Sequence, residues 1–325
     1  MVVNVAFIGA GSRATGAHYP LVTHLHQQGT VRLQAICDLN TERLETAGNR
    51  FGVERRHTDY HRMLNEERLD AVYVIMPPQY SLPIVLDCLN AGKHVLVEKP
   101  PATSFRNLEM MAHAAERNRR VTAVGFQRRY SPVTQEVRRL VLERGPVTMC
   151  IGEFHKNKLA SGRPRPGASL LLDHIDHVIH AVDFVRYMCG GEATEVHALQ
   201  DRFFEEWNNC YNALIRFSTG AVGCVSANCT SVSRFLRFEV HGRGIYAEME
   251  MPKSPGFTAR IWVDKAREPR VMTGQDLSGA PETDIDATLQ VHRSFVTAIE
   301  TGGETLTPFQ ECLGTMRLIE ALEVC

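Results

Sequence analysis

Short apolar, largely β-branched runs alternate with amphipathic stretches through the first 125 residues, and this alternation limits the fold more than any other feature. Continuous apolar runs of this length predict strands buried on both faces of a parallel sheet. The stretches between them have helical periodicity, so the segment reads as βαβ units with right-handed crossovers, a doubly wound Rossmann sheet. The predicted strands are Val2–Ile8, Val31–Cys37, Ala71–Ile75, His94–Val97 and Val121–Val124, and the main helices Ser12–Gln28, Thr41–Phe51, Ser81–Ala91 and Thr103–Asn118.

The pattern changes after Gly125. A long helix is predicted over Leu170–Cys189, and a loop-rich stretch after Asp264 leads at about Asp284 to helices over Ala287–Thr301 and Phe309–Val324. Strand-like segments joined by short turns, Phe235–His241 among them, run from Glu195 to Asp264. Such strands predict an α+β domain with a large open, mainly antiparallel sheet. We therefore expect two domains, residues 1–124 and 125–325, as a length of 325 residues at roughly 150 residues per domain also suggests.

Charge and cysteine usage exclude several classes of protein. Lys plus Arg number 36 and Asp plus Glu 37, a net charge of −1, which argues against a nucleic-acid binder. The 9 cysteines are scattered, odd in number and without a CxxC pair, which favours a reducing, cytoplasmic location over a zinc ribbon or disulfide framework. The N-terminus reads as a strand and not as a signal peptide, and apolar runs stay short of the ~20 residues of a membrane span. We expect a small-molecule substrate and neither a nucleic-acid nor a membrane partner.

A glycine-rich turn lies directly between the first predicted strand and helix. Gly9-x-Gly11-x-x-Ala14 fits the dinucleotide pattern: Gly9 permits the tight turn, and Gly11 lets the backbone approach a pyrophosphate at the helix N-terminus. Asp38 ends the second strand, where a carboxylate accepts hydrogen bonds from ribose hydroxyls and repels a 2′-phosphate. NAD is therefore favoured over NADP, although Arg43 nearby leaves NADP open. The alternative is a plain βα turn that binds no ligand.

The long helix carries a stripe of acidic residues and histidines. At about 100° per residue, five of these side chains fall within an arc of about 120°, opposite an apolar face. Carboxylate–histidine neighbours at i and i+4 can orient an imidazole for proton transfer. Three interpretations stay open: an acid/base site, a metal site, and a solvated or hydrogen-bonded structural face. The five residues are Asp173, Asp176, His177, His180 and Asp183.

Residues 92–101, Gly-Lys-His-Val-Leu-Val-Glu-Lys-Pro-Pro, place Glu98-Lys99-Pro100 where a strand ends at the carboxyl edge of the sheet. The chain resembles the glucose–fructose oxidoreductase/inositol dehydrogenase/MocA (Gfo/Idh/MocA) family over nearly its whole length. Besides this segment, the resemblance rests on the glycine turn, the Asp/His helix, Gly125–Tyr130, Gly145-Pro146-Val147 and Phe217–Gly223. The resemblance implies a lysine near the nicotinamide and substrate, and an Asp-x-x-x-His pair on the long helix.

Lys99 matches the family lysine directly, whereas both Asp173/His177 and Asp176/His180 fit the spacing of the pair. The family commonly has His-x-x-Asp followed seven residues later by Gly, and His180, Asp183 and Gly190 match this pattern. The match favours Asp176 and His180 as the pair, with Asp173 and His177 as the alternative. The turn Met76-Pro77-Pro78, Ser81 and Gln127 depart from the family pattern. The candidates implied are catalytic Lys99, Asp176 and His180; cofactor-binding Gly9, Gly11, Ser12, Arg13, Ala14, Asp38, Pro77, Glu98 and Gln127; substrate-binding Arg128, His155, Asp173 and His177; and no metal ligands.

The resemblance implies an NAD-dependent oxidoreductase that transfers a hydride to or from a secondary alcohol of a sugar, inositol or related polyol. Two alternatives are an NAD-dependent glycosidase that uses transient oxidation and a non-catalytic cofactor or sugar sensor. The open sheet of the second domain predicts a homodimer or homotetramer, because an exposed sheet face can be buried against another subunit.

Overall fold

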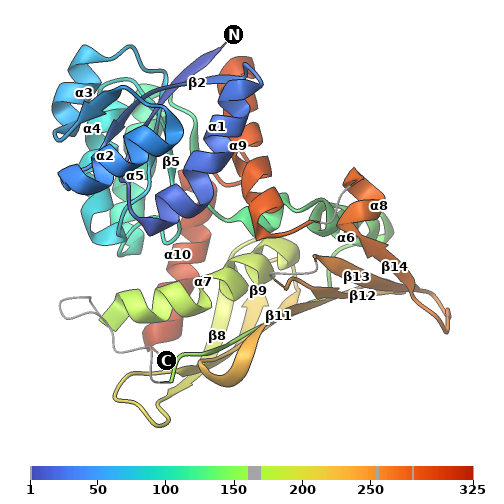
Figure 1. Ribbon diagram of the computed structural model, residues 1–325. Helices are drawn as coiled ribbons and strands as arrows, with labels where there is room; N and C mark the ends of the chain where they lie inside the picture. The colour runs from blue at the N-terminus through green and yellow to red at the C-terminus, as the bar shows by residue number, and fades with distance from the viewer. Residues whose placement is uncertain (1, 160–169, 253–255, 280–281, 325) are drawn as a thin grey trace. The chain divides into compact units, whose positions relative to one another are not determined.

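The computed structural model describes residues 2–159, 170–252, 256–279 and 282–324, with side chains at all of these except 170–177 and 323–324. The chain forms two compact units, which Figure 1 shows as ribbons. The first comprises Met1–Phe126 and Thr288–Leu313, and the second comprises Gln127–Ala287 and Gly314–Cys325.

The first unit is built on a six-stranded parallel sheet, which confirms the predicted doubly wound fold. Its strand order is β3-β2-β1-β4-β5-β6, so the chain adds strands on one side of β1 and then, from β4 onward, on the other side. Ligands of such sheets bind at this change of order, between β1 and β4. The strands are β1 Val3–Ile8, β2 Val31–Cys37, β3 Arg55–His57, β4 Ala71–Val74, β5 His94–Val97 and β6 Thr122–Val124. Sequence reasoning missed β3 because this short edge strand, Arg-Arg-His, has no apolar pattern.

Helices follow the strands as predicted, and the helix after the glycine turn differs in its first turn. There the helix opens with a π-helical turn, η1 (Ala14–His18), before α1 (Tyr19–Gln27). Side-chain caps fix other helix starts: Ser104 accepts a hydrogen bond from the backbone N–H of Asn107 at α5 (Phe105–Asn118). The remaining helical segments are α2 Thr41–Phe51, α3 Tyr60–Glu66, η2 Pro78–Tyr80 and α4 Ser81–Asn90.

Residues 288–313 join the first unit, although the expected boundary after residue 124 would put them in the second domain. They comprise most of α9 (Asp284–Thr301), the segment after it and the start of α10 (Phe309–Val324). The hydroxyls of Thr305 and Thr307 donate to the carbonyl oxygens of Thr122 and Val124 on β6, at 2.7 and 2.8 Å. These partners lie 183 residues apart in sequence, so local patterns carry no signal for the contact.

The second unit contains an eight-stranded sheet of order β14-β13-β12-β11-β7-β10-β9-β8, in which β7 and β10 pair in parallel and the other neighbouring strands pair antiparallel. The α+β prediction is thus confirmed, while β14 and α8 lie in a stretch predicted to be loop. The strands are β7 Met149–Asn157, β8 Ala193–Asp201, β9 Cys210–Phe217, β10 Val222–Asn228, β11 Thr230–Gly242, β12 Ile245–Glu250, β13 Thr258–Val263 and β14 Arg270–Thr273; the helical segments are η3 Gln127–Tyr130, α6 Pro132–Arg144, α7 Leu170–Cys189 and α8 Gly274–Ser278.

Two glycines let α7 lie close against this sheet. A Cβ on Gly152 of β7 or Gly223 of β10 would meet the methyl groups of Val185 at 2.8 and 2.6 Å. The rings of Phe184 and Phe238 stack beside them, with centroids 3.7 Å apart. This packing fixes α7 on one face of the sheet (Figure 1). None of the helices among the described residues is long and apolar enough to span a membrane.

Candidate functional site

The glycine turn lies where the sheet order reverses. Gly9 follows β1 with φ +108°, and its N–H donates to the carbonyl of Cys37 at 2.8 Å. A Cβ on Gly9 would lie 2.2 Å from the carbonyl oxygen of Ile75, just past β4. Only glycine fits this conformation and this close approach.

The surroundings of Gly11 and Asp38 fit a dinucleotide. A Cβ on Gly11 would meet no atom within 4 Å, so a ligand can approach the backbone there. Asp38 Oδ2 accepts the N–H of Ala10 at 2.7 Å and Oδ1 that of Asn40 at 2.8 Å. These bonds fix the carboxylate beside the turn, and each oxygen keeps a lone pair for a ribose hydroxyl. The early N–H groups of the following helix are suited to a pyrophosphate.

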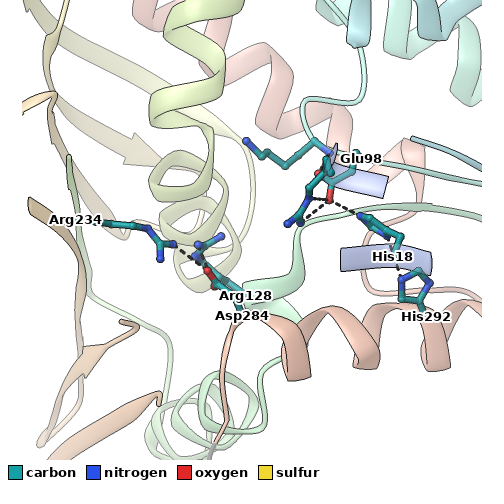
Figure 2. A network of polar contacts seen from close by, with 8 residues as sticks. His18, Glu98, Arg128, Arg234, Asp284 and His292 are labelled. Carbon is teal, nitrogen blue, oxygen red and sulfur yellow. Dashed lines mark hydrogen bonds and ion pairs between the residues drawn. The ribbon is translucent and has the colours of Figure 1, made fainter. Parts of the chain in front are cut away.

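Glu98, the first residue after β5, is the centre of a buried polar network (Figure 2). Arg13 Nε donates to Glu98 Oε1 at 2.8 Å, and His18 Nε2 lies 2.7 Å from the same oxygen. His18 Nδ1 lies 3.2 Å from Nε2 of His292 on α9. The backbone N–H of Lys99 donates to Glu98 Oε2 at 2.9 Å. Glu98 therefore links Arg13, which follows the glycine turn, to the backbone of Lys99.

The network sets the charges of its members. Burial favours a neutral Glu98, but the hydrogen bond from His18 and the charge of Arg13 outweigh burial and hold the pKa of Glu98 well below its usual range. Burial, reinforced by His18, holds the pKa of His292 well below its usual range, so this ring is neutral. An ionised Glu98 accepts hydrogen bonds at both oxygens, which orients Arg13 and the backbone of Lys99.

The other candidates for the cofactor lie in different surroundings. Ser12 and Pro77 are exposed, Ala14 is buried, and the side chain of Lys99 is half-buried. Gln127 is buried but belongs to the second unit. The structure thus brings Gly9, Gly11, Arg13, Asp38, Glu98 and Lys99 to the carboxyl edge of one sheet, and Gln127 is described apart from them.

The Asp/His stripe of the long helix is described only in part. The side chains of Asp173, Asp176 and His177 lie outside the described residues, so the choice between the two pairs stays a prediction. His180 is 8% exposed, and its ring centroid lies 5.9 Å from that of Phe154 on β7. His180 therefore lies on the face of the sheet that α7 covers.

Asp183, the last member of the stripe, has a structural partner. Arg129 of η3, fully buried, donates to both oxygens of Asp183, at 2.9 Å from Nε and 2.6 Å from Nη2. The hydroxyl of Thr315 on α10 donates to Asp183 Oδ1 at 2.8 Å. Asp183 thus anchors α7 to η3 and α10, a role that burial and paired hydrogen bonds define.

Arg128 and His155, the substrate candidates outside α7, lie in different places. Arg128 is almost fully buried, and its Nη2 lies 3.3 Å from Asp284 Oδ1. His155 follows Phe154 on β7 and so points to the opposite face, where its Nε2 lies 4.0 Å from Glu153 Oε1. The structure does not group His155 with His180.

Sequence reasoning missed four polar residues that the fold brings into these clusters. His18 and His292 lie 274 residues apart, and neither belongs to a motif. Arg234 lies just before the predicted strand Phe235–His241. Asp284 lies outside the helix predicted from Ala287, because α9 begins three residues earlier than predicted. The sequence contains a signal for this earlier start, the capping pair Thr283 and Asp286, and in the structure Thr283 N and Oγ1 both donate to Asp286. The four residues are His18, Arg234, Asp284 and His292.

Comparison with known proteins agrees with this geometry. Residues 3–126 match the model of the Gfo/Idh/MocA oxidoreductase family, NAD-binding Rossmann fold, and residues 135–246 match the model of the family's C-terminal domain. The chain is 27% identical over 254 residues to a myo-inositol 2-dehydrogenase of Thermotoga maritima, covering 74% of this chain and 70% of the relative. It is 26% identical over 316 residues to a D-apiose dehydrogenase of Paraburkholderia graminis, covering 92% and 82%.

A solved structure of levoglucosan dehydrogenase with NADH and levoglucosan has the same fold, with a TM-score of 0.86 and 21% identity, over 100% of this chain and 97% of that one. The two family models together cover more than half of the sequence and include the glycine turn, Asp38 and Glu98-Lys99. On these grounds the chain belongs to the Gfo/Idh/MocA family of oxidoreductases, whose N-terminal Rossmann domain binds NAD.

Proposed function

We propose that this protein is an NAD-linked dehydrogenase that oxidises, or in reverse forms, a secondary alcohol of a sugar, inositol or related polyol. The relatives named above act on an inositol and on a sugar. The observation that carries the proposal is the position of Glu98, which hydrogen-bonds both Arg13 and the backbone of Lys99. A lysine held beside a dinucleotide turn can act on the reacting oxygen of an alcohol.

The proposed mechanism divides the chemistry between cofactor and protein. When bound, NAD supplies the oxidising capacity by accepting a hydride. The imidazole of His180 takes the hydroxyl proton, a task suited to a group whose ordinary pKa is about 6.5. The ammonium of Lys99 donates a hydrogen bond to the same oxygen and stabilises its developing negative charge. Asp176 orients His180, and Asp173/His177 is the alternative pair.

Site-directed variants test these roles. With the substrate that gives the fastest NADH formation, Lys99→Ala and His180→Ala should each lower kcat by at least ~100-fold, the lower range for a general acid/base or electrostatic group. NAD affinity, measured by calorimetry, should stay near wild type. His177→Ala is the matched control. If His180→Ala keeps the wild-type kcat and His177→Ala loses activity, the proton acceptor is His177 of the alternative pair.

The preference for NAD over NADP rests on Asp38. Its carboxylate is fixed by the N–H groups of Ala10 and Asn40, so it would remain close to a 2′-phosphate and repel it. Calorimetric titration with each cofactor should give at least tenfold tighter binding of NAD, and Asp38→Asn should narrow that ratio. Equal dissociation constants in the wild-type protein would contradict the argument.

A further inference from the structure

Three cationic side chains surround one aromatic ring in the second unit. Lys156 Nζ lies 4.1 Å from the ring centroid of Phe154, and the guanidinium carbons of Arg234 and Arg128 lie 5.5 and 5.8 Å from it. These side chains come from β7, β11 and η3. The ring of His180 packs on the same Phe154, at 5.9 Å. The cations therefore adjoin the proposed proton acceptor within one unit.

One carboxylate, that of Asp284, joins the two arginines (Figure 2). Arg128 Nη2 lies 3.3 Å from one of its oxygens and Arg234 Nη2 lies 3.1 Å from the other. Each contact uses one nitrogen, whereas an arginine–carboxylate pair commonly uses two. Lys156, Arg128 and Arg234 thus lie together beside Phe154, and Asp284 bridges the two arginines.

Arg234 provides an independent sign that an anion binds at this cluster. Its Nη1 is buried and has no hydrogen-bond acceptor among the described residues. The pairing of β11 with β7 is irregular between Thr230 and Phe235, and Arg234 lies within this interruption. Such irregularities re-aim side chains and occur beside active sites. A buried guanidinium N–H beside two other cations is suited to a ligand oxygen that carries negative charge.

We propose that Arg234, Arg128 and Lys156 bind a carboxylate of the substrate, which is therefore a polyhydroxy acid such as an aldonic or uronic acid, not a neutral polyol. This inference rests on the proposed function and narrows its substrate class. A planar carboxylate can receive paired N–H groups from Arg234 while the hydroxyl-bearing carbons extend toward His180. A phosphate dianion fits less well, because the first turn of α9 beside the arginines already carries Asp284 and Asp286.

Matched substrate pairs test the proposal with the full-length protein and NAD. D-gluconate is compared with D-glucitol, and D-glucuronate with D-glucose; each pair differs by a carboxylate in place of a CH₂OH group. D-glucose 6-phosphate is the phosphate arm. We expect kcat/KM at least tenfold higher for an acid than for its neutral partner, and we expect this ratio to fall with added salt. Neutral partners used as well as the acids, or the phosphate used best, would overturn the proposal.

Arg234→Gln should lower the acid-to-neutral ratio at least tenfold, and Arg234→Lys should restore part of it. Arg267→Gln, which removes one positive charge from an exposed loop position, is the control and should leave the ratio unchanged. Melting curves confirm that each variant is folded. An Arg234→Gln ratio equal to that of the wild type would also overturn the proposal.

A binding measurement separates this inference from the proposed function. Calorimetry with D-gluconate and D-glucitol in the presence of NADH needs no turnover. Tighter gluconate binding that Arg234→Gln abolishes supports the carboxylate site even if NADH never forms with any substrate. Turnover of neutral polyols without any gluconate preference would support the dehydrogenase and refute the carboxylate site.

Discussion

The buried ion pair between Arg129 and Asp183 gives the sharpest prediction for stability. Both side chains are nearly inaccessible to solvent, and two hydrogen bonds of 2.9 and 2.6 Å join them. Asp183→Asn keeps the shape of the side chain and removes its charge, so the buried guanidinium of Arg129 loses the negative charge of Asp183. Breaking such a pair from one side costs about 3–5 kcal/mol, because the remaining charge stays desolvated.

Thermal unfolding followed by circular dichroism measures this loss. For a unit of about 150–250 residues, 1 kcal/mol shifts Tm by about 2–4 °C, so a fall of about 6–20 °C is expected. Glu136→Gln is the control, since it breaks a partly exposed pair with Arg139 on α6 and should cost about 1 kcal/mol or less.

A second variant separates the buried charge from the loss of packing. Arg129→Met combined with Asp183→Leu replaces both charges by apolar groups and should recover most of the stability, since well-packed apolar pairs often match buried ion pairs. A Tm shift for Asp183→Asn no larger than that for Glu136→Gln would refute the claim that this pair anchors α7.

Two further predictions concern pH and cofactor binding. Burial raises the pKa of Glu282 to about 7, above its unfolded value of 4.5, so the stability it contributes is complete below pH 4.5 and is lost as pH rises through 7. In the wild-type protein this group should lower the free energy of unfolding by about 3 kcal/mol between pH 4.5 and 8, and Glu282→Gln should remove that decline. Guanidinium unfolding at a series of pH values measures it, and an unchanged pH profile in the variant would contradict this pKa. Gly9→Ala places a Cβ 2.2 Å from the carbonyl oxygen of Ile75, at a φ of +108° that alanine rarely adopts. NAD binding measured by calorimetry should therefore weaken at least tenfold. Gly16→Ala is the control, because its Cβ meets no atom within 4 Å, and it should bind NAD within about twofold of wild type. Equal NAD affinity in the two glycine variants would show that the turn at Gly9 does not shape the cofactor site.

Local patterns predicted the fold well where burial and periodicity agree. The strands of the parallel sheet are apolar and bounded by turns, and their ends place Gly9 and Asp38 beside each other, as the Asp38–Ala10 hydrogen bond shows. The strand Arg55–His57 and the position of residues 288–313 were beyond sequence reasoning, because an edge strand needs no apolar pattern and a contact across 183 residues has no local signal.

The candidate sites show the same limit. Angular periodicity placed Asp183 and His180 on one face of α7, but periodicity alone does not separate a structural carboxylate from a functional one. The burial of Arg129 beside Asp183 makes that distinction. The cationic cluster around Phe154 was equally hidden, because Arg234 and Asp284 lie at the margins of predicted elements and meet only in three dimensions.

Oxidation of a hydroxylated substrate with net reduction of NAD distinguishes the proposed dehydrogenase from a glycosidase that uses NAD only transiently. The most direct measurement follows NADH absorbance with purified protein, NAD and a panel of sugars, inositols and sugar acids, beside chromogenic glycosides. We expect substrate-dependent NADH formation, which Lys99→Ala abolishes while NAD still binds. Release of the chromophore from a glycoside without net NADH, or no NADH with any compound, would contradict it.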